Sequence, residues 1–231
     1  MIRAIVFDFD GTLVDSNDVK LQTFYEVTKS QDPTGSTVTR ILKQFPNKDR
    51  YGLFQAIIRE LCTKNRTEDS KYLETLATQW AEDYTVRCEK AIEKCEEISG
   101  TSETLRWLSE QRLPIFINSR TPTTTLKRLV TLRSLHLYVS DIYGAPATKS
   151  ENLRLIQSQT QAQPKEILFV GDSEDDRAAA LEVGCHFVGV VLRDKPRFSY
   201  PHPERWITNL YQLQKIVEAL QMKDPQGNKV H

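Results

Sequence analysis

The sequence has no net charge and no long apolar run, and each of these absences excludes a class of protein. Lysine plus arginine and aspartate plus glutamate both number 31 among the 231 residues, so the formal net charge at pH 7 is zero. This balance argues against a protein that binds nucleic acid through a basic surface. The longest apolar runs are only a few residues, which is too short to span a membrane. We therefore expect neither a nucleic-acid partner nor a membrane anchor.

Cysteine is also scarce, and the spacing of the cysteines does not match that of a metal site. The four cysteines form no CxxC pair and no cluster with histidine, so they are typical of free thiols in a reducing compartment. The first residues enter an apolar run at once and do not resemble a secretory signal. These features predict a cytoplasmic protein. The cysteines are Cys62, Cys88, Cys95 and Cys185.

The most informative stretch lies at the start of the chain. Residues 2–7 are apolar and rich in isoleucine and valine, which is typical of a buried strand in a parallel sheet. Two carboxylates, Asp8 and Asp10, follow at alternate positions, where ligands of a doubly wound sheet bind. Carboxylates this close repel each other unless a cation lies between them or one keeps its proton. The stretch therefore predicts a site for Mg²⁺ or a carboxylate that attacks phosphorus, with the hydroxyl of Thr12 nearby. The alternative is a strand that ends in an ordinary polar turn.

Residues 17–98 have a different pattern, with apolar side chains at helical spacing. One stripe recurs every four positions and consists of Tyr72, Leu76, Trp80, Tyr84 and Cys88. We interpret this aromatic stripe as the core of a helical bundle rather than as a binding surface. The pattern predicts an all-helical domain at residues 17–98, inserted into an α/β domain formed by residues 1–16 and 99–222. The polar residues 223–231 are expected to form a flexible tail.

Strands alternate with helices through the rest of the chain. This order predicts a doubly wound, Rossmann-like parallel sheet with right-handed crossovers, so the fold class is α/β with an inserted helical cap domain. After the first strand, further strands are expected at 113–119, 137–143, 167–170 and 187–192, and a closing helix at 207–220.

Polar side chains follow several of these strands. Ser119 closes the second strand, where its hydroxyl can hold a phosphate oxygen or simply cap the next helix. Lys149 precedes a predicted helix, a position where the helix dipole disfavours a positive charge, although most lysines are surface lysines. The run Gly-Asp-Ser-Glu-Asp-Asp at 171–176 follows the strand at 167–170. Acidic capping of a helix would explain Glu174 but not three aspartates so close together.

The run Asp-Phe-Asp-Gly-Thr-Leu-Val-Asp-Ser at 8–16 resembles the first motif of the haloacid dehalogenase-like hydrolases, most of which are phosphatases. Ser119 and Lys149 are similar to the second and third motifs of that family, and residues 171–176 match the fourth, GDxxxD. The helical insertion after the first motif resembles the cap of the branch that contains phosphoglycolate phosphatase and beta-phosphoglucomutase. All four motifs occur in order, and each lies at a predicted strand end or in the adjoining loop.

The resemblance implies a two-step phosphoryl transfer that depends on Mg²⁺. In it, Asp8 forms an aspartyl-phosphate and Asp10 is the general acid and base. Ser119 and Lys149 stabilise the phosphoryl oxygens, and the helical domain closes over the site to exclude water. The implied metal ligands are Asp8, Asp10, Asp172 and Asp176, with Asp175 as the alternative to Asp176.

The expected partner is a small phosphorylated metabolite, namely a sugar phosphate or a phosphoglycolate-like monoester. Candidate substrate contacts, each of which has an ordinary solvated charge or hydroxyl as its alternative, are Thr12, Lys20, Lys48, Arg50 and Arg120. A phosphonate hydrolase would need a cap lysine, for which Lys20 or Lys48 is available. A phosphosugar mutase is disfavoured because such relatives have histidine where Lys20 stands. A catalytically silent binding or regulatory protein is disfavoured because Asp8 and Asp10 are both intact.

Overall fold

The computed structural model describes the chain except for residues 46–47, 64–69, 193–197 and 223–231. The predicted tail at 223–231 therefore lies outside the described residues. The chain divides into two compact units, Met1–Asp15 with Cys95–His231, and Ser16–Lys94. Across the described ranges, no helix is both long enough and apolar enough to cross a bilayer.

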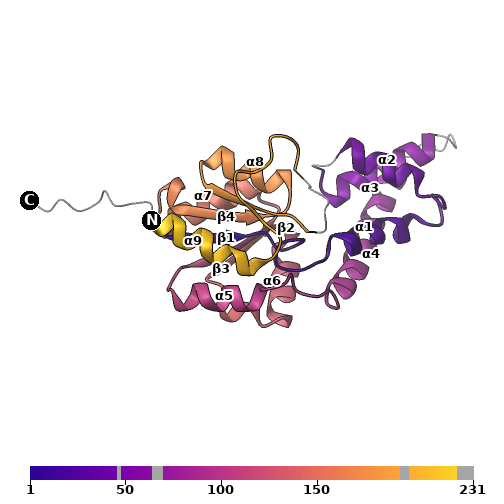
Figure 1. The fold of residues 1–231 in the computed structure, drawn as a ribbon. Helices are drawn as coiled ribbons and strands as arrows, with labels where there is room; N and C mark the ends of the chain where they lie inside the picture. The colour runs from indigo at the N-terminus through magenta and orange to yellow at the C-terminus, as the bar shows by residue number, and fades with distance from the viewer. Residues whose placement is uncertain (46–47, 64–69, 193–197, 223–231) are drawn as a thin grey trace, which may run out of the picture. The chain divides into compact units, whose positions relative to one another are not determined.

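The first unit is built on a six-stranded sheet in the order β3-β2-β1-β4-β5-β6, and every pair of neighbours is parallel (Figure 1). The strands are β1 (Ala4–Phe7), β2 (Ile115–Pro122), β3 (Asp141–Ala145), β4 (Ile167–Gly171), β5 (His186–Val190) and β6 (Trp206–Ile207). The chain winds outward from β1 in both directions, so the order of strands reverses beside it. This confirms the predicted doubly wound α/β class, in which ligands bind where the strand order reverses.

Helices cover both faces of this sheet, which explains why its central strands are apolar throughout. Figure 1 shows α7 and α8 on one side of the sheet and α5 and α6 on the other. Val6, Phe116 and Phe169 pack in one cluster with Leu153 and Ile156 of α7. The helices of this unit are α5 (Thr101–Glu110), α6 (Thr123–Leu132), α7 (Lys149–Thr160), α8 (Glu174–Val183) and α9 (Leu213–Met222).

In the described part of the second unit, all regular structure is helical. Its helices are α1 (Asn17–Thr28), α2 (Ser36–Gln44), α3 (Arg50–Thr63) and α4 (Ser70–Ile92). The ring of Tyr84 lies 4.4 Å from that of Phe24 and 5.8 Å from that of Phe54, and Phe54 also packs edge-on against Trp80. The aromatic stripe of α4 is therefore the core of this unit, as predicted. Its first member, Tyr72, is the exception and is exposed.

Two predicted elements begin later in the chain than expected. The closing helix begins at Leu213, not at residue 207, because Trp206 and Ile207 instead pair with β5 as the short strand β6. The buried side chains Ile207, Leu210 and Leu213 recur at three-residue intervals, which imitates helical spacing. The strand expected at 137–143 begins only at Asp141, because residues 135–137 form a 3₁₀ turn.

Candidate active site

β1 and β4 end at nearly the same level, beside Ile117 in the middle of β2, and this brings the predicted site residues to one edge of the sheet. Phe7 of β1 pairs with Ile117 of β2 and with Val170 of β4. The backbone N–H of Asp8 donates to the carbonyl of Val170 at 2.9 Å, so β1 stays paired up to that residue. The residues that follow Phe7, Ile117 and Val170 are therefore neighbours in space although they are far apart in the sequence.

A tight turn holds Asp10 beside Asp8. Gly11 has a φ of 76°, a left-handed conformation that favours glycine, and its N–H donates to the carbonyl of Val14. Asp10 is buried, and its Oδ2 accepts a hydrogen bond of 2.9 Å from the hydroxyl of Thr121. Thr12 is also buried, and its Oγ1 forms no hydrogen bond with any residue that the structure describes. An unsatisfied buried hydroxyl is an available contact for a bound group.

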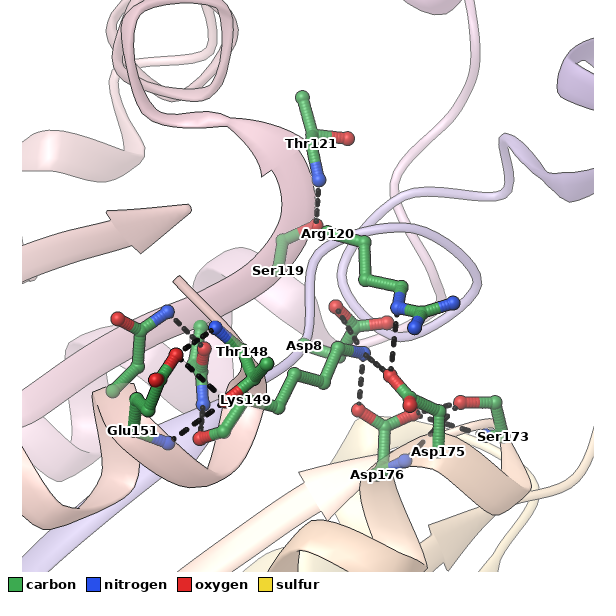
Figure 2. A network of polar contacts seen from close by, with 12 residues as sticks. Asp8, Ser119, Arg120, Thr121, Thr148, Lys149, Glu151, Ser173, Asp175 and Asp176 are labelled. Atoms are coloured by element: carbon green, nitrogen blue, oxygen red, sulfur yellow. Dashed lines mark hydrogen bonds and ion pairs between the residues drawn. The ribbon is translucent and has the colours of Figure 1, made fainter. Parts of the chain in front are cut away.

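Lys149 is the first residue of α7 and points into the site rather than into solvent (Figure 2). The helix begins with a capping box in which the side chains of Thr148 and Glu151 bond each other's backbone N–H groups. Only 6% of the Lys149 side chain is exposed, and its Nζ lies 3.2 Å from Asp8 Oδ1 and 2.5 Å from Asp176 Oδ1. This burial excludes the alternative that Lys149 is an ordinary surface lysine.

Opposing charges shift the ionisation of this pair. Burial, followed by repulsion from Asp176, Asp172 and Asp10, raises the pKa of Asp8 well above its ordinary value, although Lys149 acts in the opposite direction. Burial alone would lower the pKa of Lys149, but the carboxylates of Asp176 and Asp8 outweigh burial and raise it. Lys149 is therefore charged at neutral pH, and positive charge near Asp8 favours the ionised form of its carboxyl group.

The acidic run after β4 separates into residues with different contacts. Asp176 is fully buried and closes a capping box, because its Oδ2 accepts from the N–H and the hydroxyl of Ser173. Its Oδ1 accepts from Lys149, so both oxygens have partners. Asp175 faces Arg120, with 3.2 Å between Asp175 Oδ2 and Arg120 Nε, and the same oxygen lies 3.8 Å from Lys149 Nζ (Figure 2). Arg120 is thereby directed to this edge of the sheet although its side chain is half-exposed.

Three buried carboxylates form a group with the dimensions of a metal site. One oxygen each from Asp8, Asp172 and Asp176 lies within 4.8 Å of the other two. Mg²⁺ prefers such oxygen ligands, and burial, together with repulsion from the neighbouring carboxylates, raises the pKa of Asp8 in the protein without a metal ion. These residues fit a divalent cation. Asp10 and Asp175, which the sequence also suggested as ligands, do not belong to this group among the described residues.

Three of the predicted substrate contacts lie in the helical unit. Lys20 is half-buried in α1. The Nζ of Lys48 lies 4.4 Å from the centre of the Phe45 ring. Arg50 begins α3 and donates from Nη1 to the hydroxyl of Thr85 at 2.8 Å. Their roles in substrate binding stay a prediction.

Sequence reasoning missed a pair of buried amides, Asn118, which bonds the backbone of Lys149, and Asn152, which bonds Asn118. Nδ2 of Asn118 donates to the carbonyl of Lys149, and Oδ1 of Asn118 accepts from Nδ2 of Asn152, both at 2.9 Å. Both side chains are buried. The available signal was the single amide between the apolar residues of β2 and the site serine, Ser119. A polar side chain at a buried strand position requires a hydrogen-bond partner, and here the partner is the carbonyl of Lys149.

Sequence comparison identifies relatives along most of the chain. The family model described as haloacid dehalogenase-like hydrolase matches residues 5–190. Phosphoglycolate phosphatase from Yersinia pestis is 26% identical over 195 residues, which cover 82% of this chain and 81% of the relative. PpaX from Clostridium perfringens, provisionally named a pyrophosphatase, is 23% identical over 237 residues, which cover 95% of this chain and 99% of the relative.

Solved structures share the fold. A predicted phosphoglycolate phosphatase from Haemophilus somnus superposes with a TM-score of 0.74 at 21% identity, covering 94% of this chain and 98% of that one. YfnB from Bacillus subtilis, whose crystal structure has magnesium bound, gives a TM-score of 0.69 at 16% identity with the same coverage. The family match spans well over half of the chain, and the four motifs lie together at one sheet edge. The chain therefore belongs to the haloacid dehalogenase-like hydrolases, as its motifs predicted, and is an enzyme of the hydrolase class.

Proposed function

We propose that this chain is a Mg²⁺-dependent phosphomonoesterase that acts on a small phosphorylated metabolite through an aspartyl-phosphate on Asp8. The observation that carries the proposal is the buried carboxylate of Asp8 at the end of β1, with Lys149 Nζ at 3.2 Å and two further carboxylates beside it. A phosphatase is the activity in the name of the Yersinia pestis relative. A sugar phosphate or a phosphoglycolate-like ester is the substrate class we assign.

Asp8 is the nucleophile in this proposal. One of its carboxylate oxygens forms a bond to phosphorus as the bond from phosphorus to the leaving alcohol breaks, which leaves a phosphoryl group on Asp8. Water then attacks that phosphorus, releases inorganic phosphate and regenerates the carboxylate. The ammonium of Lys149 favours the ionised form of Asp8, which the attack requires.

Asp10 is the general acid and base. It lies two residues beyond the nucleophile on the tight turn at Gly11, where it can give a proton to the departing alcohol oxygen. In the second step it takes a proton from the attacking water. One carboxyl group can serve both steps because the first step leaves it ionised.

Ser119, Lys149 and Arg120 hold the phosphoryl oxygens. The oxygen of Ser119 accepts from the N–H of Thr121 at 3.2 Å, so its own proton is directed to another acceptor. Lys149 and Arg120 supply positive charge, and Asp175 and Asp176 fix the direction of these two cations. Preorganised donors of this kind stabilise charge that spreads over the oxygens during transfer.

Asp8 and Asp172 are the side chains that we assign as direct Mg²⁺ ligands. Both oxygens of Asp176 already accept hydrogen bonds from Ser173 and Lys149, so we assign Asp176 the task of holding Lys149. Bound Mg²⁺ would neutralise the phosphate dianion and lower the pKa of Asp8. The magnesium in the YfnB structure is consistent with this assignment.

The test is phosphate release from a panel of phosphomonoesters, assayed with Mg²⁺ and with EDTA. The panel contains 2-phosphoglycolate, glucose 6-phosphate and 4-nitrophenyl phosphate, with inorganic pyrophosphate added as a non-ester. We expect turnover of at least one monoester in Mg²⁺, and a loss of about 10³-fold or more in Asp8→Asn. Asp83→Asn is the matched control because Asp83 pairs with Arg87 on the exposed side of α4.

The covalent step has its own readout. Acid-quenched protein from ³²P-labelled substrate should carry label that hydroxylamine removes, since hydroxylamine cleaves acyl phosphates but not phosphoserine. The label should accumulate in Asp10→Asn, which hydrolyses the intermediate slowly, and should be absent from Asp8→Asn. Metal-dependent turnover that survives in Asp8→Asn would contradict the proposal.

A further inference from the structure

An irregularity in β2 directs Thr121 toward Asp10. In the pairing of β2 with β3, Asn118 lies opposite Tyr143 but Pro122 lies opposite Ala145. Residues 119–121 therefore face the single residue Gly144, and this bulge turns side chains away from the regular alternation of a strand. Bulges of this kind concentrate beside active sites, where they redirect a side chain.

The absence of a side chain at Gly144 permits this bulge. A Cβ at position 144 would lie 2.3 Å from the carbonyl oxygen of Thr121 and 2.7 Å from the backbone nitrogen of Thr123. Both are backbone atoms, which do not yield as the end of a flexible side chain does. The N–H of Gly144 also donates to the hydroxyl of Thr123 at 3.1 Å, which ties β3 to the end of the bulge. The position of Thr121 is thus fixed by the backbone of both strands.

Thr121 contacts two proposed catalytic residues at once. It is 3% exposed, and its hydroxyl donates to Asp10 Oδ2 at 2.9 Å. Its backbone N–H donates to the oxygen of Ser119 at 3.2 Å (Figure 2). A hydrogen bond from a buried neutral donor to a carboxylate oxygen restricts rotation of that carboxylate. The two contacts link the residue that binds the phosphoryl group to the residue that exchanges protons.

We infer that Thr121 is a positioning residue for Asp10, which it holds at the angle needed to protonate the leaving group. This inference rests on the proposed function. It goes beyond the four motifs because Thr121 belongs to none of them, and because its effect depends on the chemistry of the leaving group. An alkyl ester must receive a proton as its alcohol departs, whereas 4-nitrophenolate leaves as a stable anion. Misplacing the general acid should therefore slow alkyl esters selectively.

The experiment compares kcat/KM for two substrates in three variants. The substrates are 4-nitrophenyl phosphate and whichever of 2-phosphoglycolate and glucose 6-phosphate the wild type hydrolyses faster. The ratio kcat/KM is the correct quantity because it reports phosphoryl transfer to Asp8, whereas kcat also includes hydrolysis of the intermediate. The variants are Thr121→Val, which keeps the shape but removes the donor, Thr121→Ser, which keeps the donor, and Thr131→Val. Thr131→Val is the control because Thr131 is exposed on α6, where its hydroxyl donates to the carbonyl of Lys127 at 2.8 Å.

We expect Thr121→Val to lose about tenfold in kcat/KM on the alkyl ester and less than about twofold on 4-nitrophenyl phosphate. Thr121→Ser should recover most of the alkyl-ester activity, and Thr131→Val should match the wild type on both substrates. Equal losses on both substrates, or a serine variant as impaired as the valine variant, would overturn the positioning role of Thr121 but not the proposed function. A wild type without Asp8-dependent turnover would overturn the proposed function and this inference with it.

Discussion

Lys149 shows how a single buried charge organises the residues around it. Its ammonium contacts the carboxylates of Asp8 and Asp176, and all three side chains are almost entirely buried. Removing one partner of such a buried group would leave uncompensated charge, which costs several kcal/mol in typical proteins. The amide of Asn118 bonds the carbonyl of Lys149 and is itself held by the amide of Asn152. The position of Lys149 is therefore determined by polar partners at both ends of the residue.

The raised pKa of Asp8 predicts a pH-dependent response to Mg²⁺. In metal-free protein the folded state binds the Asp8 proton more tightly than the unfolded state does, so the free energy of unfolding falls as pH rises above the ordinary value of 3.8. Mg²⁺ competes with that proton. We therefore expect the increase in melting temperature caused by Mg²⁺ to grow as pH rises above the ordinary pKa of 3.8.

Thermal unfolding with EDTA and with excess Mg²⁺ at each pH measures this difference. In Asp8→Asn, which cannot exchange that proton, the Mg²⁺-induced change in melting temperature should vary less with pH. A wild-type response to Mg²⁺ that is the same at every pH would contradict the account given for Asp8.

At the scale of elements, the site depends on how strands end and helices begin. β4 passes into α8 through Gly171, where a Cβ would lie 2.4 Å from the Asp176 carboxyl carbon. Ser173 and Asp176 then start α8 with a capping box, and Thr148 with Glu151 does the same for α7. Capping residues satisfy backbone N–H groups that would otherwise lack partners. The same devices that stabilise the helices therefore place Lys149 and Asp176 at the sheet edge.

The β2 bulge gives a prediction at this scale. Gly144→Ala adds a Cβ against the backbone of Thr121, so the strands must move apart and Thr121 must withdraw from Asp10. We expect the free energy of unfolding to fall by about 1–3 kcal/mol. Urea unfolding measures the stability, and kcat/KM on an alkyl ester should fall more than on 4-nitrophenyl phosphate.

Gly52→Ala is the matched control for this substitution. Gly52 lies near the start of α3, where alanine favours the helix by up to about 1 kcal/mol over glycine. The nearest atom to its added Cβ is the movable Asp49 Oδ1, at 3.0 Å. A Gly144→Ala protein as stable and as active as Gly52→Ala would show that the bulge does not constrain Thr121.

At the scale of the whole molecule, the helical unit is inserted between two segments of the sheet unit that are hydrogen-bonded to each other. The N–H of Asp15 donates to the carbonyl of Glu96 at 3.0 Å, and the N–H of Ile98 donates to the carbonyl of Leu13 at 2.9 Å. The residues on either side of the insertion are therefore hydrogen-bonded to each other within one unit. Each unit also has its own buried core.

This arrangement predicts that the sheet unit folds without the insertion. Replacing residues 17–94 with a short glycine-serine linker should leave a protein that unfolds cooperatively and is stabilised by Mg²⁺. Circular dichroism on heating, with and without Mg²⁺, measures both properties. The control is the same deletion carrying Asp8→Asn and Asp172→Asn, which should fold but respond much less to Mg²⁺. A deletion protein without a cooperative transition would contradict the prediction.

Several features of this protein follow from the sequence because local chemistry determines them. The apolar run before Asp8, the helical spacing in residues 17–98 and the acidic run at 171–176 each have a signature within a few residues. They sufficed for the doubly wound fold class and for the family. β6 and the start of α9 were not predicted correctly because a strand of two residues is too short to show a hydrophobic period. Its residues also continue the spacing of the helix that follows.

Other features required the tertiary structure because they depend on residues that are distant in the sequence. Nothing near Thr121 in the chain indicates a contact with Asp10, 111 residues away, or a bulge permitted by Gly144. The contacts of Asp175, which lies between Arg120 and Lys149, and of Asp176, which pairs with Lys149 at shorter range, likewise depend on how α8 meets β2 and the end of β1. The sequence determined which chemical groups reach the sheet edge, since each follows its own strand. Only the packed structure decided which of them hold one another, because that depends on distances between strands.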